Sequence, residues 1–140
     1  MNERTFVMIK PEAVARGLIG DILKRIESEG FHILSVKLIR ATVADGERLY
    51  EMHASKSFYN ELINHVTSGP ILPMVVEGPK CIARIRQMAG ATNPAKAEAG
   101  TIRGDFGISV TKNIIHSADS PENAEREIKI FFNEREILNY

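Results

Sequence analysis

The sequence has a single cysteine, no long apolar run and no excess of charge of either sign. Cys81 alone can form neither an intrachain disulfide nor a cysteine-based zinc site. No apolar stretch approaches the roughly 20 residues that a membrane-spanning helix needs. Residues 1–9 lack the long apolar segment of a secretory signal. We therefore expect a cytoplasmic protein that does not cross a membrane.

The balance of charge argues against one large class of partners. Lysine and arginine together number 18, and aspartate and glutamate also number 18. A protein whose main role is to bind nucleic acid usually carries a net basic charge, so we do not expect a nucleic-acid partner. A small anion stays compatible with this composition, because it needs only two or three well-placed cations.

Common nucleotide and metal motifs are also missing. The chain has neither GxxxxGK[ST] nor GxGxxG. The triplet Asp105-Phe106-Gly107 spells DFG, but the HRD and glycine-rich loops of protein kinases are absent, so we interpret it as chance. Metal-ligand spacings such as HExxH are not found among the four histidines, which argues against a structural zinc. These are His32, His53, His65 and His116.

Length and composition predict one globular domain, residues 1–140. A chain of 140 residues can bury about 70% of the surface of its unfolded form. Its 44% hydrophobic and 26% charged residues are ordinary for a globular protein. There is no low-complexity tract and no internal repeat.

Strands and helices are predicted to alternate along the chain. Apolar runs and alternation predict strands at residues 4–10, 31–41, 71–77 and 113–116. Apolar residues at helical spacing predict helices at 18–30, 42–50, 58–66, 80–89 and 121–132. This order predicts an α/β sandwich, either ferredoxin-like or a small doubly wound sheet.

Local signals refine these elements. Thr42 and Ser120 are candidate N-caps, Gly30 is a helix stop, and Pro73 predicts an edge position for the third strand. The segment 90–112 has four glycines and no clean period. An irregular segment of this length in a compact domain is usually functional or disordered, and its varied polar content favours a functional loop.

Three reactive side chains occupy positions that need an explanation. Arg86 lies in an apolar helical stripe, so it either extends from the edge of the core or meets an anion. Glu127 lies on the apolar side of the last helix, as an edge carboxylate, a structural ion-pair partner or the hydrogen-bond partner of a reactive group. His116 precedes that helix, whose N-terminus favours negative charge. This histidine is either structural or a phosphoryl acceptor. Asn113 can serve the same site only if the chain bends between Asn113 and His116.

Taken together, the motifs resemble those of the nucleoside diphosphate kinase family. The similarity runs from residue 3 to about residue 140, and each motif alone would be a weak match. In order, the motifs are RTF…IKP at 4–11, TSGP at 67–70, GATNP at 90–94, GTIRGDF at 100–106 and NIIH…DS at 113–120.

The resemblance implies a ferredoxin-like sandwich, an α/β (α+β) fold with a four-stranded antiparallel sheet and helices packed on it. It implies transfer of the γ-phosphoryl group from a nucleoside triphosphate, typically ATP, to a nucleoside diphosphate. A phosphohistidine on His116 would carry the group in a ping-pong mechanism. The resemblance also implies a homo-oligomer, a hexamer or tetramer built from dimers.

Roles for the other site residues follow from the same resemblance. Glu127 would orient His116, and Tyr50 and Arg103 would contact the transferred phosphoryl group. Further nucleotide contacts would come from Arg86 and Thr92 on the other phosphates, Lys10 and Asn113 on the ribose, and Phe58 and Val110 on the two faces of the base. Mg²⁺ would arrive with the nucleotide phosphates, with Asp119 reaching it through water.

The chemistry of these residue types fits phosphoryl transfer. Such a reaction needs positioning and positive charge around the phosphoryl oxygens, which paired arginine donors supply. A neutral imidazole is already a nucleophile near pH 7. Stacking on Phe58 would read the face of a base rather than its edges, which predicts broad base tolerance.

The chain departs from the family pattern directly after the histidine. The family usually has glycine and serine where this chain has Ser117 and Ala118. If the backbone needed a left-handed conformation at residue 117, the serine would be strained there. Neither change removes a residue that the transfer needs, so we expect activity.

Three rival functions use the same sequence features. A regulatory module could bind nucleotides without turnover, although the intact site residues argue against it. A protein-directed histidine phosphotransferase would use the same His116, and transfer to a nucleoside diphosphate distinguishes the two. Nucleic-acid binding is the third, against which the neutral charge argues.

Overall fold

The protein alternates short strands and helices, as a computed structural model describes for residues 2–140. Residue 1 of the predicted domain 1–140 lies outside that range. The strands are β1 (Asn2–Ile9), β2 (His32–Val36), β3 (Leu72–Pro79) and β4 (Ile115–Ser117). The α-helices are α1 (Pro11–Ala15), α2 (Ile19–Ser28), α3 (Val43–Leu49), α4 (Tyr59–Val66), α5 (Cys81–Ala89), α6 (Ile102–Phe106) and α7 (Pro121–Phe131). Short 3₁₀ helices are η1 (Glu51–His53), η2 (Pro94–Lys96) and η3 (Glu134–Glu136).

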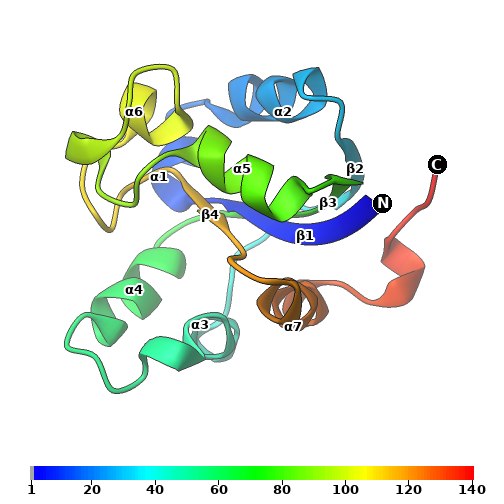
Figure 1. Ribbon diagram of the computed structural model, residues 1–140. Coiled ribbons are helices and arrows are strands. Elements are labelled where there is room, and N and C mark those ends of the chain that lie inside the picture. Colours follow the sequence, from blue (N-terminus) through cyan, green and yellow to red (C-terminus); the bar gives the residue numbers. More distant parts are fainter. Residues whose placement is uncertain (1) are drawn as a thin grey trace.

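The strands form one four-stranded antiparallel sheet in the order β2-β3-β1-β4. This is the ferredoxin-like arrangement, and it rules out the alternative of a doubly wound parallel sheet. Helices cover both faces of the sheet (Figure 1): α2 and α5 lie on one side, and α3, α4 and α7 on the other. No helix within residues 2–140 is long and apolar enough to span a membrane.

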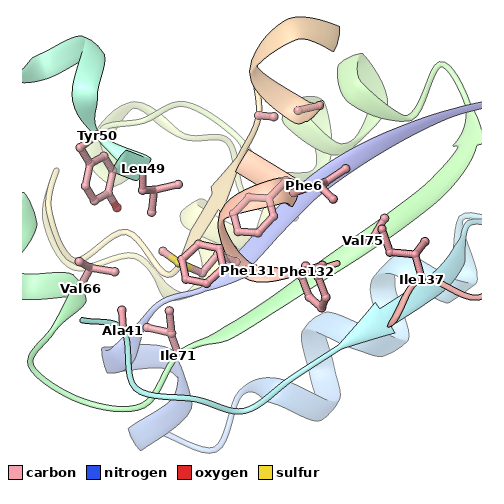
Figure 2. Close-up of a cluster of buried hydrophobic side chains, with 14 of the residues drawn as sticks. Phe6, Ala41, Leu49, Tyr50, Val66, Ile71, Val75, Phe131, Phe132 and Ile137 are labelled. Carbon is pink, nitrogen blue, oxygen red and sulfur yellow. The ribbon is translucent and has the colours of Figure 1, made fainter. Parts of the chain in front are cut away.

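Alternation along the central strand β1 builds a separate core on each face of the sheet. Phe6 and Met8 point toward α7, where Phe6 stacks on Phe131 with ring centroids 5.4 Å apart (Figure 2). Val7 and Ile9 point to the opposite face, against α2 and α5. These four β1 side chains are fully buried, so packing on both faces of the sheet fixes the position of Lys10, which follows β1.

Several local signals act as expected. Thr42 caps α3 in a capping box with Asp45, and Ser120 caps α7 by accepting from the Asn123 amide at 3.2 Å. Gly30 has a φ of 86°, which suits a glycine after the end of α2. Cys81, to which the sequence assigned no chemistry, is buried at the start of α5.

The prediction of an edge strand from Pro73 is wrong. β3 lies between β2 and β1, and Pro73 pairs with Met8. The proline is tolerated because it occupies the second residue of β3, beyond the end of β2 at Val36, while its carbonyl still accepts from the Lys37 amide at 3.1 Å. β2 is also shorter than predicted: its ladder with β3 ends at Val36, and an isolated bridge between Ile39 and Ile71 follows.

The segment 90–112 has more regular structure than its sequence suggested. It contains η2 and the five-residue helix α6, whose N-cap Thr101 accepts from the Gly104 amide at 3.1 Å. The DFG triplet lies at the end of α6, where Asp105 pairs with Arg25 at 2.9 Å and Phe106 packs under the same guanidinium. These contacts give the triplet a structural role.

Candidate active site

A cavity of about 790 Å³ lies where the end of β1 meets β4, α7 and the α3–α4 hairpin. It collects side chains from segments that are far apart in the sequence. Every residue that the sequence analysis assigned to the nucleotide site contributes to its wall, and so does Asp119. They are Lys10, Tyr50, Phe58, Arg86, Thr92, Arg103, Val110, Asn113, His116 and Glu127.

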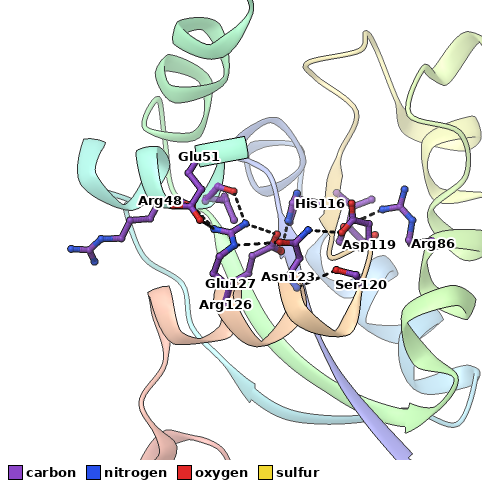
Figure 3. Close-up of polar contacts among 12 residues, drawn as sticks. Arg48, Glu51, Arg86, His116, Asp119, Ser120, Asn123, Arg126 and Glu127 are labelled. Atoms are coloured by element: carbon purple, nitrogen blue, oxygen red, sulfur yellow. Dashed lines mark hydrogen bonds and ion pairs between the residues drawn. The ribbon is translucent and has the colours of Figure 1, made fainter. Parts of the chain in front are cut away.

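His116 on β4 and Glu127 on α7 form a short hydrogen bond, with Nε2 of the ring 2.7 Å from Oε1 of the carboxylate (Figure 3). Glu127 is 2% exposed, so the interpretation of an edge carboxylate is wrong. Because a carboxylate accepts, Nε2 carries the proton and the Nδ1 lone pair is left for chemistry. The ring is held further by Phe6 and Tyr50, whose centroids lie 5.9 and 6.1 Å from it.

Arg126, which the sequence analysis did not single out, ties this pair to α3. Its guanidinium lies 3.4 Å from Oε2 of Glu127 and 3.5 Å from Glu51. It also donates to the carbonyl oxygens of Arg48 and Leu49, at 2.5 and 3.4 Å. Figure 3 shows it bridging α7 and the end of α3, so it joins the Glu127 carboxylate to the segment that carries Tyr50.

The bend that Asn113 and His116 need is present at Ile114. This β-branched residue has a φ of 81°, a conformation that costs an L-residue energy. The Ile115 amide donates to the Asn113 carbonyl at 3.0 Å, which closes a three-residue γ-turn. The turn reorients the chain directly before β4, and Asn113 and His116 both reach the cavity.

Two buried cations supply positive charge to the cavity. Lys10 is 6% exposed and donates from Nζ to Asn113 Oδ1 at 2.7 Å, and burial lowers its pKa to about 8. Arg103 is 9% exposed and donates to the carbonyls of Gly90 and Ile115 at 2.9 and 2.8 Å. Burial first, and then the charge of Arg86, lower the pKa of Arg103 to about 10. Both shifts arise first because burial disfavours the charged side chain, so a bound anion would stabilise these cations.

Arg86 and Asp119 are exposed residues of the cavity wall. Arg86 donates to the Ser117 carbonyl at 3.3 Å, and its exposed side chain does not pack as part of the apolar core. A hydrogen bond from Asn123 at 2.7 Å, with the charge of Arg86 contributing, holds the pKa of Asp119 below its usual value. Among residues 2–140, Lys10, Arg86 and Arg103 take part in no ion pair with a carboxylate.

The remaining residues occupy the floor and the mouth. Tyr50 is 6% exposed, and burial together with the charge of Glu127 raises its pKa, so its phenol stays protonated and can donate. Phe58 and Val110 are apolar yet 39% and 56% exposed at the mouth. The sequence analysis missed His53, whose ring lies 5.3 Å from that of Phe58.

The two departures after the histidine are accommodated without backbone strain. Among residues 2–140, only Lys80 and Ile114 are non-glycine residues with a positive φ, so Ser117 is not in a left-handed conformation. Its hydroxyl is buried without a hydrogen-bond partner. Ala118 is 1% exposed and packs in the core that contains Phe6.

The site as a whole defines a class of protein. The imidazole of His116 has one nitrogen bonded to a carboxylate and the other free. The cavity also holds cations that form no ion pair with a carboxylate of residues 2–140, and it has an apolar mouth. Such a cavity suits an anion with a flat apolar end, as a nucleotide has, and a nucleophile that can accept a phosphoryl group. The fold and site are those of a histidine-based, nucleotide-binding phosphotransferase.

Comparisons with known proteins agree with this class. The sequence model for nucleoside diphosphate kinase matches residues 3–137. A nucleoside diphosphate kinase of Thermosipho melanesiensis is 57% identical over 99% of this chain and 94% of its own length. The enzyme of Methanocaldococcus jannaschii is 54% identical, with 99% of each chain covered. The solved structure of the Halobacterium salinarum enzyme, a complex with CDP, superposes with a TM-score of 0.96 at 41% identity, covering 100% of this chain and 93% of that one.

The chain therefore belongs to the nucleoside diphosphate kinase family. Its ferredoxin-like fold and its activity as a phosphotransferase between nucleotides are those that the sequence predicted. The comparisons do not assign roles to individual side chains, so the roles given to the cavity residues stay predictions.

Proposed function

We propose that this protein moves the γ-phosphoryl group of a nucleoside triphosphate to a nucleoside diphosphate through a phosphohistidine on His116. The observation that carries the proposal is the bond between His116 Nε2 and Glu127 Oε1, at 2.7 Å. This bond leaves Nδ1 free to act as the nucleophile, in a cavity whose cations form no ion pair with a carboxylate of residues 2–140.

In the first half-reaction, the Nδ1 lone pair attacks the γ-phosphorus of the triphosphate. The N–P bond forms as the bond from phosphorus to the β,γ-bridging oxygen breaks, and that oxygen leaves on the diphosphate. The ring becomes positively charged as the N–P bond forms. The buried Glu127 carboxylate stabilises this charge through the Nε2 proton, which stays on the ring.

In the second half-reaction, a terminal β-phosphate oxygen of the acceptor diphosphate attacks the same phosphorus. The N–P bond breaks, and the electron pair returns to Nδ1 as the new triphosphate leaves. Donor and acceptor use one cavity in turn, so ping-pong kinetics follow.

The cations and the apolar mouth would hold the nucleotide. Arg103 and the protonated Tyr50 hydroxyl would contact the transferred group, and Arg86 and Thr92 the other phosphates. A second set of contacts would hold the nucleoside: Lys10 and Asn113 on the ribose, Phe58 and Val110 on the base. The CDP complex of the Halobacterium salinarum relative supports a nucleotide in this fold, and stacking through Phe58 supports tolerance of different bases.

Mg²⁺ is part of the proposal as a companion of the nucleotide. Asp119 on the cavity wall, with a pKa below its usual value, offers one ionised carboxylate. Mg²⁺ usually binds through one or two carboxylates plus substrate phosphates, so this donor fits it, with water between. When bound, the ion would neutralise part of the charge on the phosphates.

Residues 1–140 would act as a single domain in a cytoplasmic homo-oligomer. The hexamer and the tetramer, both built from dimers, are the forms that the family resemblance supports. Sedimentation velocity at micromolar concentration distinguishes the two assemblies from each other and from a monomer.

The direct test is phosphoryl labelling with γ-labelled ATP and Mg²⁺. We expect an acid-labile label on the wild-type protein, none on His116→Ala, and its complete transfer to added GDP. A nucleotide that binds without labelling the protein would refute the proposal and favour a regulatory module. A label that a nucleoside diphosphate does not discharge would favour a protein-directed phosphotransferase.

A further inference from the structure

The strained turn at Ile114 is held from both sides. The Lys10 amide donates to the Ile114 carbonyl at 2.9 Å, which fixes the turn to the end of β1. On the other side, the Ile114 amide donates to Oε2 of Glu12 at 2.9 Å. Glu12 belongs to α1, a short helix that the sequence analysis did not predict. It is a side-chain clamp on the turn, and it does not line the cavity.

A second buried group holds Glu12 in place. Oε1 of Glu12 lies 2.6 Å from Nε2 of His65 on α4, and the two side chains are 8% and 12% exposed. Burial alone would raise the pKa of Glu12, but the hydrogen bonds from His65 and from the Ile114 amide more than offset it, and the pKa lies below its usual value. Each carboxylate oxygen therefore has its own partner, and the side chain has a fixed geometry.

We propose that Glu12 is a positioning residue for phosphoryl transfer, which holds the γ-turn at Ile114 and through it aims Asn113 and His116 into one cavity. The inference rests on the proposed function of His116. Its basis is geometric: a left-handed β-branched residue is unfavourable by itself, so it persists only where its surroundings fix it. The bond to an ionised carboxylate is the stronger kind of hydrogen bond to a backbone amide.

Loss of the clamp changes the reaction rate through geometry. When the turn relaxes toward ordinary φ, the direction of β4 at His116 changes relative to Glu127 and to the bound phosphates. Misplacement of a reacting group by about 1 Å can reduce a rate on the order of a hundredfold. Ground-state binding through the arginines would suffer less, so kcat falls more than KM rises.

The experiment compares Glu12→Met with Glu12→Gln. Methionine fills a similar volume but removes both oxygens, whereas glutamine keeps one acceptor for the Ile114 amide. With γ-labelled ATP and Mg²⁺ in rapid quench, we expect His116 labelling to slow on the order of ten- to a hundredfold in Glu12→Met. Glu12→Gln should restore most of the rate.

Glu3→Met is the matched control, because Glu3 also accepts from a backbone amide, that of Ile82 on α5, at 2.9 Å. Glu3 does not line the cavity. We expect Glu3→Met to lower the melting temperature and leave the labelling rate unchanged. If Glu12→Met labels as fast as wild type, or if Glu3→Met slows labelling equally, the proposal is wrong.

A second readout needs no activity and covers the case in which Glu12→Met does not fold. In ¹H–¹⁵N spectra without nucleotide, the Ile114 amide proton should move upfield in Glu12→Gln, since a neutral acceptor replaces a charged one. An unmoved Ile114 resonance overturns the clamp. Absence of label on wild-type protein, by contrast, overturns the proposed function of His116, and the amide shift still decides the clamp.

Discussion

Substitution of Glu127 by glutamine should slow phosphorylation of His116 without weakening nucleotide binding. Glu127 is 2% exposed and lies 2.7 Å from the histidine, so it meets the charge that develops on the ring. A hydrogen bond between a charged group and its partner contributes about 1.5–3 kcal/mol. At about 1.4 kcal/mol per factor of ten, the loss corresponds to about a ten- to 150-fold lower rate.

The assay is single-turnover phosphorylation of the protein by ATP and Mg²⁺ in rapid quench. The limiting rate should fall by that factor, while the half-saturating ATP concentration changes little, because Glu127 is not expected to contact nucleotide. Glu125→Gln is the matched control: its carboxylate lies on the same helix, is 75% exposed and, within residues 2–140, forms one ion pair, with Lys129 at 3.8 Å. A limiting rate in Glu127→Gln within twofold of wild type would refute the reasoning.

Four further predictions follow from other parts of the site. Burial lowers the pKa of Lys10 to about 8, so its side chain loses its positive charge as the pH increases through that value. The KM for nucleotide should therefore rise as the pH increases through about 8. Steady-state kinetics of Lys10→Met should lack this rise. Phe58→Ala should raise the KM of ATP and GTP alike by about five- to 150-fold, the usual range for one stacked base; an effect on one base only would contradict stacking. Ser117→Ala removes a buried hydroxyl without a partner, so calorimetry should show a free energy of unfolding higher by about 1 kcal/mol; a lower value would show that the hydroxyl is satisfied. Ala118→Ser should change turnover by less than about tenfold and lower stability, because a hydroxyl enters a packed core; turnover that increases more than this would show that the hydroxyl matters.

Much of the fold was predictable because its signals are local. The apolar run of β1, the Thr42 and Ser120 caps and the Gly30 stop each act within a few residues. The strand order was not predictable from residues alone, since it depends on pairing between distant segments. The edge position predicted from Pro73 was wrong for this reason. A proline near the end of an interior strand is tolerated where the neighbouring strand has already ended.

The site was predictable where residue type and motif carry the chemistry, and not where the fold supplies a partner. Arg103 and His116 could be identified because motifs of the family include them, and Arg86 because it interrupts an apolar helical stripe. Arg126 and the Glu12–His65 pair could not, because their contacts cross 77 and 53 residues of chain. The one signal for the turn was the placement of Asn113 and His116 three residues apart, which requires a bend.

The account depends most on which nitrogen of His116 takes the phosphoryl group. The measurement is isomer analysis of the phosphohistidine: label the protein with ATP and Mg²⁺, hydrolyse it in alkali, and separate the two phosphohistidine isomers against standards. Because Nε2 is held by Glu127 at 2.7 Å, the account predicts the isomer phosphorylated at Nδ1. Recovery of the Nε2 isomer would contradict it.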